Sequence, residues 1–248
     1  VERLVETLRR ASIEIRLTPD YLRALTIEET DDYSVFIRLR EWLLGEMGIG
    51  YPDFAFVPDE SCKSRSFVFR INDLECTPWT GLQPDQFMVV GSLEQLSEMG
   101  GAVLPVTNPA ARSSAALIDQ SLLPQARTAG LAIWSALDHL ALCLYADLLE
   151  HSASMLDESM VRDSLREFEQ SHPALVRAVL GRVSLAGLTR ALRALLVESV
   201  CIRDIQLILD AVLNFSWIVV DEPSYIVLDE RVATITPPNT EWLEDPVN

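Results

Sequence analysis

The sequence predicts an α+β protein of several subdomains: an N-terminal α/β sandwich-like part, a small inserted part and an all-helical part. Two observations predict this class. The first third of the chain combines short runs that have the period of strands with one amphipathic helix, whereas residues 136–214 carry helical periodicity almost without interruption. The chain has 248 residues, of which 49% are hydrophobic, so it is long enough to bury a sizeable core.

The elements of the first third follow from spacing. Residues 12–17 alternate, which places Ile13, Ile15 and Leu17 on one face of a strand. A helix begins at Ser34, whose side chain can cap it, and ends at the glycine- and proline-containing run 48–52. The apolar positions of this helix recur at helical spacing: Val35, Phe36, Leu39, Leu43 and Leu44. Three further strand-like runs lie at 54–57, 66–71 and 87–90.

The rest of the chain changes character twice. Glycine, proline and small residues dominate 91–112, which predicts a loop-rich subdomain, followed by a short helix at 124–129 and a strand at 131–134. Consecutive helices are then expected at 136–151, 157–170, 173–181, 184–198 and 202–214. A β-like hairpin is expected at 217–220 and 225–228. Residues 236–248 form an extended linker, and because no terminating element follows it, we expect a trimmed piece of a longer chain.

The charge balance excludes some partners. Lys and Arg number 20 against 37 Asp and Glu, a net charge of −17. Nucleic acids and anionic membrane surfaces need a basic footprint, so neither is expected as a partner. Lys63 is the single lysine, so almost every cation is a guanidinium suited to pairing with carboxylates. The four cysteines form no CxxC pair, which is typical of a reduced, cytosolic protein.

Arginines gather in the helical part. Residues 161–204 hold seven arginines and five acidic residues, a local charge of +2, which leaves −19 for the remainder of a chain of net charge −17. One interpretation is a solvated helical face. The other is a block that docks on an acidic surface of a neighbouring copy. The most apolar stretch, 131–149, is interrupted by Asp138, His139 and Asp147, which favours a buried helix over a membrane span.

Catalytic signals are weak in this sequence. It contains no nucleotide-binding glycine motif, no nucleophile elbow and no HExxH metal motif. His139 and Cys143 stand four residues apart on the helix expected at 136–151, a spacing that can present two metal ligands, but their apolar neighbours favour a buried structural pair. We therefore expect neither an enzyme nor a cofactor. A hydrolytic or metal-dependent enzyme domain and a monomeric adaptor are the alternatives.

The most specific pattern lies at 184–213. It reads LTRALRALL at 188–196, VCIRDI at 200–205 and ILDA at 208–211. This stretch resembles the large export-gate family, the inner-membrane gate proteins of bacterial flagellar and virulence type III secretion systems, whose cytosolic part carries a pattern like LxxVLxxLLxExVxIRDxxxILEAL. Looser similarity covers most of the preceding chain, at 35–50, 67–71, 82–84, 108–111 and 130–133.

The resemblance implies a division into subdomains. A discontinuous α/β subdomain would comprise 1–84 and 136–155, a small inserted subdomain 85–135, a helical ring-forming subdomain with its C-terminal hairpin 156–235, and a linker to a missing last subdomain 236–248. It also implies a membrane domain before residue 1. The fragment itself would be cytosolic, without direct membrane contact, while the whole protein is anchored at the cytoplasmic face of the inner membrane.

The resemblance further implies partners and sites. The family forms a nonameric ring that receives export chaperones with their cargo, a gatekeeper protein and other components of the export apparatus. Ring-interface candidates are Arg190, Arg193, Arg203 and Asp204. Docking candidates, carried over from the family's pocket, are Asn108, Pro109, Ala110, Ala111 and Leu142.

The chain departs from the family at this pocket. Asn108 and Ala111 stand where the family's DPAF motif has an acidic residue and an aromatic one, and 140–144 lacks the threonine of its VATHL motif. These departures, together with the long 215–236 segment, favour a virulence-type gate over a flagellar one.

Overall fold

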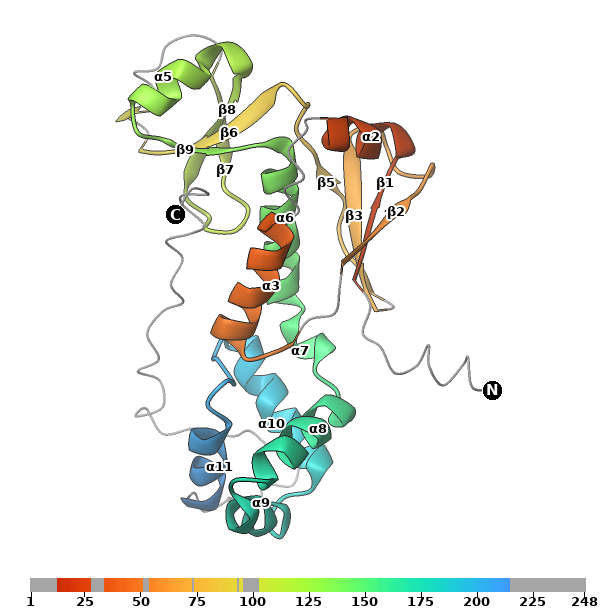
Figure 1. Ribbon diagram of the computed structural model, residues 1–248, viewed down its shortest axis with the longest axis vertical. Coiled ribbons are helices and arrows are strands. Elements are labelled where there is room, and N and C mark those ends of the chain that lie inside the picture. The colour runs from red at the N-terminus through yellow and green to blue at the C-terminus, as the bar shows by residue number, and fades with distance from the viewer. Residues whose placement is uncertain are drawn as a thin grey trace. The chain divides into compact units, whose positions relative to one another are not determined.

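The structure is a computed structural model that describes residues 13–27, 34–50, 54–72, 74–92, 94–95 and 103–214. Within these residues the chain divides into two compact units. The first, a mixed α/β unit, contains the described residues of 13–40 and 54–149, and the second, a helical unit, contains those of 41–50 and 150–214. Figure 1 labels most elements of both units.

The first sheet is built around β1 (Ile13–Leu17). The strand order is β2 (Phe54–Pro58), β1, β3 (Ser66–Ile71) and β4 (Leu74–Glu75), and β5 (Trp79–Thr80) also pairs with β3. β1 runs parallel to β2 and antiparallel to β3. Its residues alternate between buried and partly exposed, as the sequence predicts. The core face of the sheet therefore carries the apolar side chains of β1.

Two helices accompany this sheet in the chain. α2 (Pro19–Ile27) follows β1 directly, and the hydroxyl of its buried Tyr21 donates to the Leu82 carbonyl at 2.8 Å. In the first turn of α3 (Ser34–Met47), the ring of Phe36 makes edge contacts with the rings of Phe54 and Phe56 on β2. These contacts fix the first turns of α3 against the sheet because aromatic side chains bury large apolar areas.

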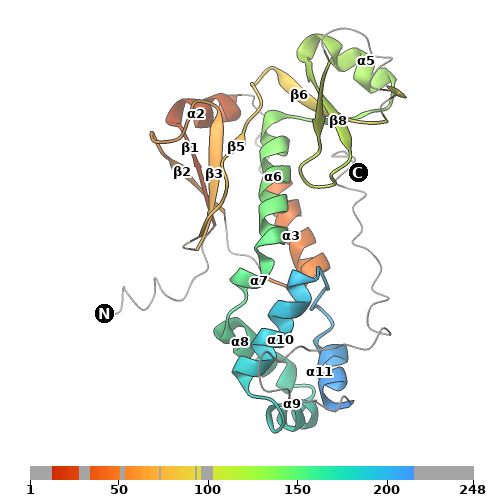
Figure 2. The ribbon, with the colours of Figure 1, turned by 180° about the vertical axis from the view of Figure 1, so that it is seen from behind.

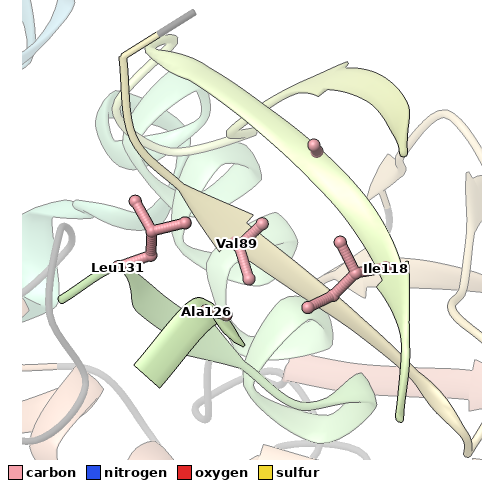
Figure 3. Packing of buried hydrophobic residues seen from close by; sticks show 5 residues of the cluster. Val89, Ile118, Ala126 and Leu131 are labelled. Atoms are coloured by element: carbon pink, nitrogen blue, oxygen red, sulfur yellow. The ribbon is translucent and has the colours of Figure 1, made fainter. Parts of the chain in front are cut away.

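The second sheet is entirely antiparallel. Its order is β7 (Leu104–Thr107), β8 (Ser114–Asp119), β6 (Gln86–Val90) and β9 (Ala132–Trp134). A short 3₁₀ turn (Gln120–Leu122) and α5 (Leu123–Thr128) connect β8 to β9. Figure 3 shows the small core between α5 and the strands, where Val89, Ile118, Ala126 and Leu131 are gathered.

The helix α6 (Ala136–Glu150) is buried along most of its length. It corresponds to the stretch that the sequence assigns to a buried helix rather than a membrane span. In the part of the chain that the structure describes, no helix combines the length and the apolar character needed to cross a membrane.

The helical unit contains α7 (Ser152–Met155), α8 (Glu158–Glu169), α9 (Pro173–Leu180), α10 (Leu185–Val197) and α11 (Ile205–Asn214). α10 packs against α7 and α8, and α9 packs against α8 and α11 (Figure 2). Side-chain caps begin two of these helices: Asp157 accepts from the Met160 amide at 2.8 Å, and Ser184 accepts from the Gly187 amide at 3.1 Å. The spacing of apolar residues in the sequence predicts one stripe on each of the last two helices: Leu188, Leu192, Leu195 and Leu196 on α10, and Ile205, Ile208, Leu209 and Val212 on α11. The structure buries all of these side chains except that of Ile205, which is partly exposed.

The mixed α+β class is confirmed, and most expected elements are present within a few residues of their predicted bounds. The sequence patterns missed α2, α7, β8 and the two-residue strands β4 and β5, and they assigned the residues of β7 to a loop-rich region. β7 is an edge strand that contains Pro105, and proline lowers the strand signal although edge strands tolerate it. The expected hairpin at 217–228 and the linker at 236–248 lie outside the described residues, and the subdomain boundaries stay a prediction.

Candidate functional site

The docking candidates Asn108–Ala111 form the turn between β7 and β8. Asn108 is completely buried, and its Oδ1 accepts hydrogen bonds from the amides of Ala110 at 2.9 Å and Ala111 at 3.2 Å. Its backbone amide donates to the Ser113 carbonyl at 3.0 Å. The asparagine side chain thus organises the turn from inside. What the turn presents outward is partly exposed Pro109, Ala110 and Ala111.

The fifth docking candidate, Leu142, lies on a different element. It stands in the middle of α6, where its side chain is 1% exposed. A residue with so little accessible surface acts on a partner through the packing of its neighbours rather than by contact. Of the five docking candidates, the three small residues of the turn therefore offer the accessible surface.

The ring-interface candidates differ in what their side chains do. Arg190 is exposed on α10, and within the described residues the structure gives its side chain no hydrogen bond or ion pair. On the same helix, the Arg193 Nε donates to the Leu156 carbonyl at 2.7 Å. Leu156 is the C-terminal cap residue of α7, so this guanidinium ties α10 to the end of another helix.

Arg203 and Asp204 lie in the segment between α10 and α11. The Arg203 Nη1 donates to the Gly45 carbonyl in the last turn of α3 at 2.7 Å. The Asp204 Oδ1 accepts from the Leu207 amide at 3.0 Å, as an N-terminal cap of α11 does. Both residues are exposed, but both are also engaged within their own chain.

The arginine block as a whole serves carbonyl groups more than carboxylates. In addition to Arg193 and Arg203, Arg177 donates to the Pro173 carbonyl at 3.1 Å, and Arg182 donates to the Leu213 carbonyl near the end of α11. The carbonyls that accept from Arg182, Arg193 and Arg203 lie at or near the C-terminal ends of helices, where carbonyls lack partners within the helix and carry partial negative charge, so these guanidinium groups stabilise them. Pro173 differs, because it is the first residue of α9. Arg166 pairs with Asp163 across one helical turn at 3.4 Å, with both side chains exposed.

His139 and Cys143 are buried together on α6, with the Cys143 Sγ 3.8 Å from the His139 Nε2. Burial lowers the pKa of His139 to about 4 and raises the pKa of the Cys143 thiol above its usual range. Both groups are therefore neutral at pH 7. In the described ranges no three His, Cys, Asp or Glu side chains gather in a way that could hold a metal ion. The two side chains are thus buried and in contact with each other.

One further residue on this face of α6 is polar and buried. Asp147 stands one turn after Cys143, and its Oδ2 accepts from the Trp79 indole Nε1 at 3.1 Å. The bond ties β5 to α6 within the mixed unit. Asp147 also contributes to the raised pKa of Cys143, after burial itself, because a nearby negative charge disfavours the thiolate.

One important position was interpreted too narrowly from the sequence. The sequence places Gly48 in the glycine- and proline-containing run that ends α3, and the structure confirms that α3 ends just before it. The Gly48 backbone also lies against that of Arg203. A spacing of 155 residues gives no local signal for such a contact. The only sequence clue is the glycine itself, since glycines recur where two backbones approach closely.

The protein-family model called the FHIPEP family matches residues 2–233, so the chain belongs to this family. The predicted resemblance to the large export-gate proteins of type III secretion is thereby confirmed.

A curated relative supports this assignment. The chain is 23% identical to the invasion protein InvA of Salmonella typhimurium strain LT2 over 184 residues, which are 74% of this chain and 26% of InvA. The chain thus matches about a quarter of the length of this relative.

Solved structures show the same fold. The CdsV protein of Chlamydia pneumoniae is similar with a TM-score of 0.72 and 20% identity, over 82% of this chain and 65% of the CdsV chain. The nonameric cytosolic domain of EscV, from a type III secretion system, is similar with a TM-score of 0.61 and 17% identity, over 83% of this chain and 58% of that one.

Proposed function

We propose that this chain is the cytosolic ring and docking platform of a virulence-type type III secretion export gate. In this role it receives chaperone–cargo complexes and a gatekeeper protein, and it helps to set which substrates are exported and in what order. The observation that carries the proposal is family membership across 2–233, combined with a fold shared with the cytosolic domain of EscV.

Two observations support the virulence type. The curated relative InvA is named an invasion protein. In addition, the turn at the family's docking pocket has Ala111 where an aromatic residue is expected, and its Asn108 side chain is buried in the turn. Both features leave a surface of small residues in place of an aromatic anchor.

The proposal includes the place of the chain in the whole protein. The matched relative is about four times longer than the matched region, which leaves room for a membrane domain. We place the chain at the cytoplasmic face of the inner membrane. Within it we retain the expected division into 1–84 with 136–155, 85–135 and 156–235.

Ring formation is the part of the proposal that rests on the arginines. Among the four interface candidates, Arg190 has an exposed side chain without a partner in the described residues, whereas those of Arg193, Arg203 and Asp204 are engaged within the chain. Arg190 is therefore the candidate that is available to an acidic neighbour. The large negative charge of the rest of the chain supplies such surfaces on another copy.

The experiment is sedimentation velocity over a range of protein concentrations, with cryo-electron microscopy of the concentrated sample. We expect a monomer at low concentration and rings of nine copies at high concentration. Salt should weaken the rings because exposed charges are screened beyond about 8 Å at physiological ionic strength.

Arg190→Glu should abolish the rings while leaving thermal unfolding unchanged. Arg127→Glu is the matched control, because Arg127 is also an exposed arginine on a helix but lies in the mixed unit, outside the block. If Arg190→Glu assembles as the wild type does, the electrostatic account of the ring is wrong. A chain that stays monomeric at every concentration would favour the adaptor alternative instead.

A further inference from the structure

We propose that residues 201–204, here called the strap, act as a clamp that holds the C-terminal end of α3 in place. Arg203 is the positioning residue of this clamp, and Gly48 is the residue against whose backbone the strap packs. The strap connects α10 to α11 and lies in the same helical unit as residues 41–50. The proposal concerns a single copy of the chain, so it does not depend on ring formation.

The first element of the clamp is a pair of hydrogen bonds to the end of α3. The Ile202 amide donates to the Met47 carbonyl at 3.1 Å, and the Arg203 Nη1 donates to the Gly45 carbonyl at 2.7 Å. The last carbonyls of a helix have no partner inside it, and they form the negative end of its dipole. The strap therefore supplies both a neutral and a cationic donor where α3 needs them.

The second element is close contact between backbones. Gly48 has φ of +74°, and a Cβ at this position would lie 2.3 Å from the Arg203 amide nitrogen and 2.8 Å from the Ile202 carbonyl carbon. A side chain at 48 would thus collide with main-chain atoms, and the positive φ would strain it as well. The strap can approach the end of α3 this closely because residue 48 is glycine.

The third element is anchoring of the strap on both sides of Arg203. The Ile202 side chain is buried, and the Arg203 amide donates to the Cys201 Sγ at 3.4 Å. On the other side the Asp204 Oδ1 accepts from the Leu207 amide and so begins α11. The arginine is consequently held from its own backbone, which orients its guanidinium toward Gly45.

This arrangement gives the Ile202–Arg203–Asp204 triplet a role in each copy. Its three residues act in turn on the end of α3 by a main-chain bond, on the same helix end by a guanidinium, and on the start of α11 by a carboxylate. The strap therefore couples the end of α3 to the beginning of α11. Its bond between Arg203 and Gly45 joins residues that are 158 positions apart in the sequence.

The test is amide hydrogen exchange of the whole chain, followed by mass spectrometry at a concentration where sedimentation shows a monomer. Arg203→Met keeps an unbranched side chain but removes the guanidinium and its hydrogen-bond donors. It should accelerate exchange in 45–50 by about tenfold or more, because a hydrogen bond from a charged group is lost. Arg203→Lys keeps a cationic donor and should restore part of the protection. Gly48→Ala should accelerate exchange in both 45–50 and 201–207.

Arg190→Met is the matched control, since it removes an exposed arginine that has no partner in the described residues. Its exchange in 45–50 should equal that of the wild type. Strands β1 and β3 report on the mixed unit and should keep their protection in every variant. If residues 45–50 of the Arg203→Met variant exchange at the wild-type rate, the clamp proposal is wrong. It is also wrong if exchange in β1 and β3 rises by as much as exchange in 45–50. If no rings form but Arg203→Met accelerates amide exchange in 45–50, the ring proposal is rejected and the clamp proposal is supported.

Discussion

At the scale of single residues, this chain uses its polar side chains mainly on its own backbone. Asn108 satisfies two amides of its turn, and Arg193 and Arg203 each satisfy a carbonyl far away in the sequence. Buried or helix-terminal backbone groups are costly when they lack partners, so each of these side chains stabilises a defined bend of the chain. Residue type alone does not reveal these bonds within the chain, because they depend on tertiary contacts.

His139 should make the stability of the chain pH-dependent. Its folded-state pKa of about 4 lies below the usual value of 6.5, so the unfolded chain binds the proton more readily. The contribution of neutral, buried His139 to the free energy of unfolding is fully present above pH 6.5 and is lost as the pH falls toward 4. Between pH 7 and pH 5 the free energy of unfolding should fall by about 2 kcal/mol from this group.

The measurement is urea unfolding of the wild type and His139→Met at both pH values. The methionine variant retains a side chain of similar bulk but cannot titrate, so it should lose less stability than the wild type between pH 7 and pH 5. Equal losses of stability in the two proteins would show that protonation of His139 does not cause the pH dependence.

At the scale of elements, sequence periodicity succeeded where one face of a helix is buried against its neighbours. The stripes of α10 and α11 are buried as expected, except at Ile205, and the caps Asp157 and Ser184 begin α8 and α10. It failed for the short elements α2 and α7 and for the edge strand β7, which have few turns or a proline. Such elements are formed by contacts with distant segments more than by their own pattern.

Leu192→Ala tests the stripe on α10. The side chain is 2% exposed, so the truncation removes packed apolar contacts and leaves a cavity, which should cost about 2–5 kcal/mol of unfolding free energy. Leu207→Ala is the matched control on α11, because Leu207 is 50% exposed and the same truncation should cost much less. Thermal melting distinguishes them, and a melting temperature of Leu192→Ala equal to that of the wild type contradicts a buried stripe.

At the scale of the whole molecule, the described residues divide into two units, and the chain matches about a quarter of the length of InvA. In the proposed function the turn at 108–111 contributes to a docking surface. The small side chains that this turn presents lack an aromatic anchor, and anchors of that kind often contribute about 2 kcal/mol or more to binding.

This difference predicts a partner preference. The chain should bind a flagellar filament chaperone–cargo complex weakly or not at all, and Ala111→Phe should improve the binding by supplying the missing aromatic. Isothermal titration calorimetry measures both proteins, with Ala110→Phe as the control for an added ring at the neighbouring position of the same turn. Micromolar binding by the wild type that Ala111→Phe leaves unimproved would contradict this account of the pocket.

The sequence alone determined the class of the fold, the longer helices of 136–214, the three longest strands of the first sheet, and the family, because these depend on local periodicity and on a motif at fixed spacing. The tertiary structure decided what the candidate residues do. It buried Leu142, enclosed Asn108 in a turn, and gave Arg203 a partner 158 positions away. Such pairings depend on which helix ends and turns meet when the apolar faces pack, and no spacing along the chain encodes that meeting.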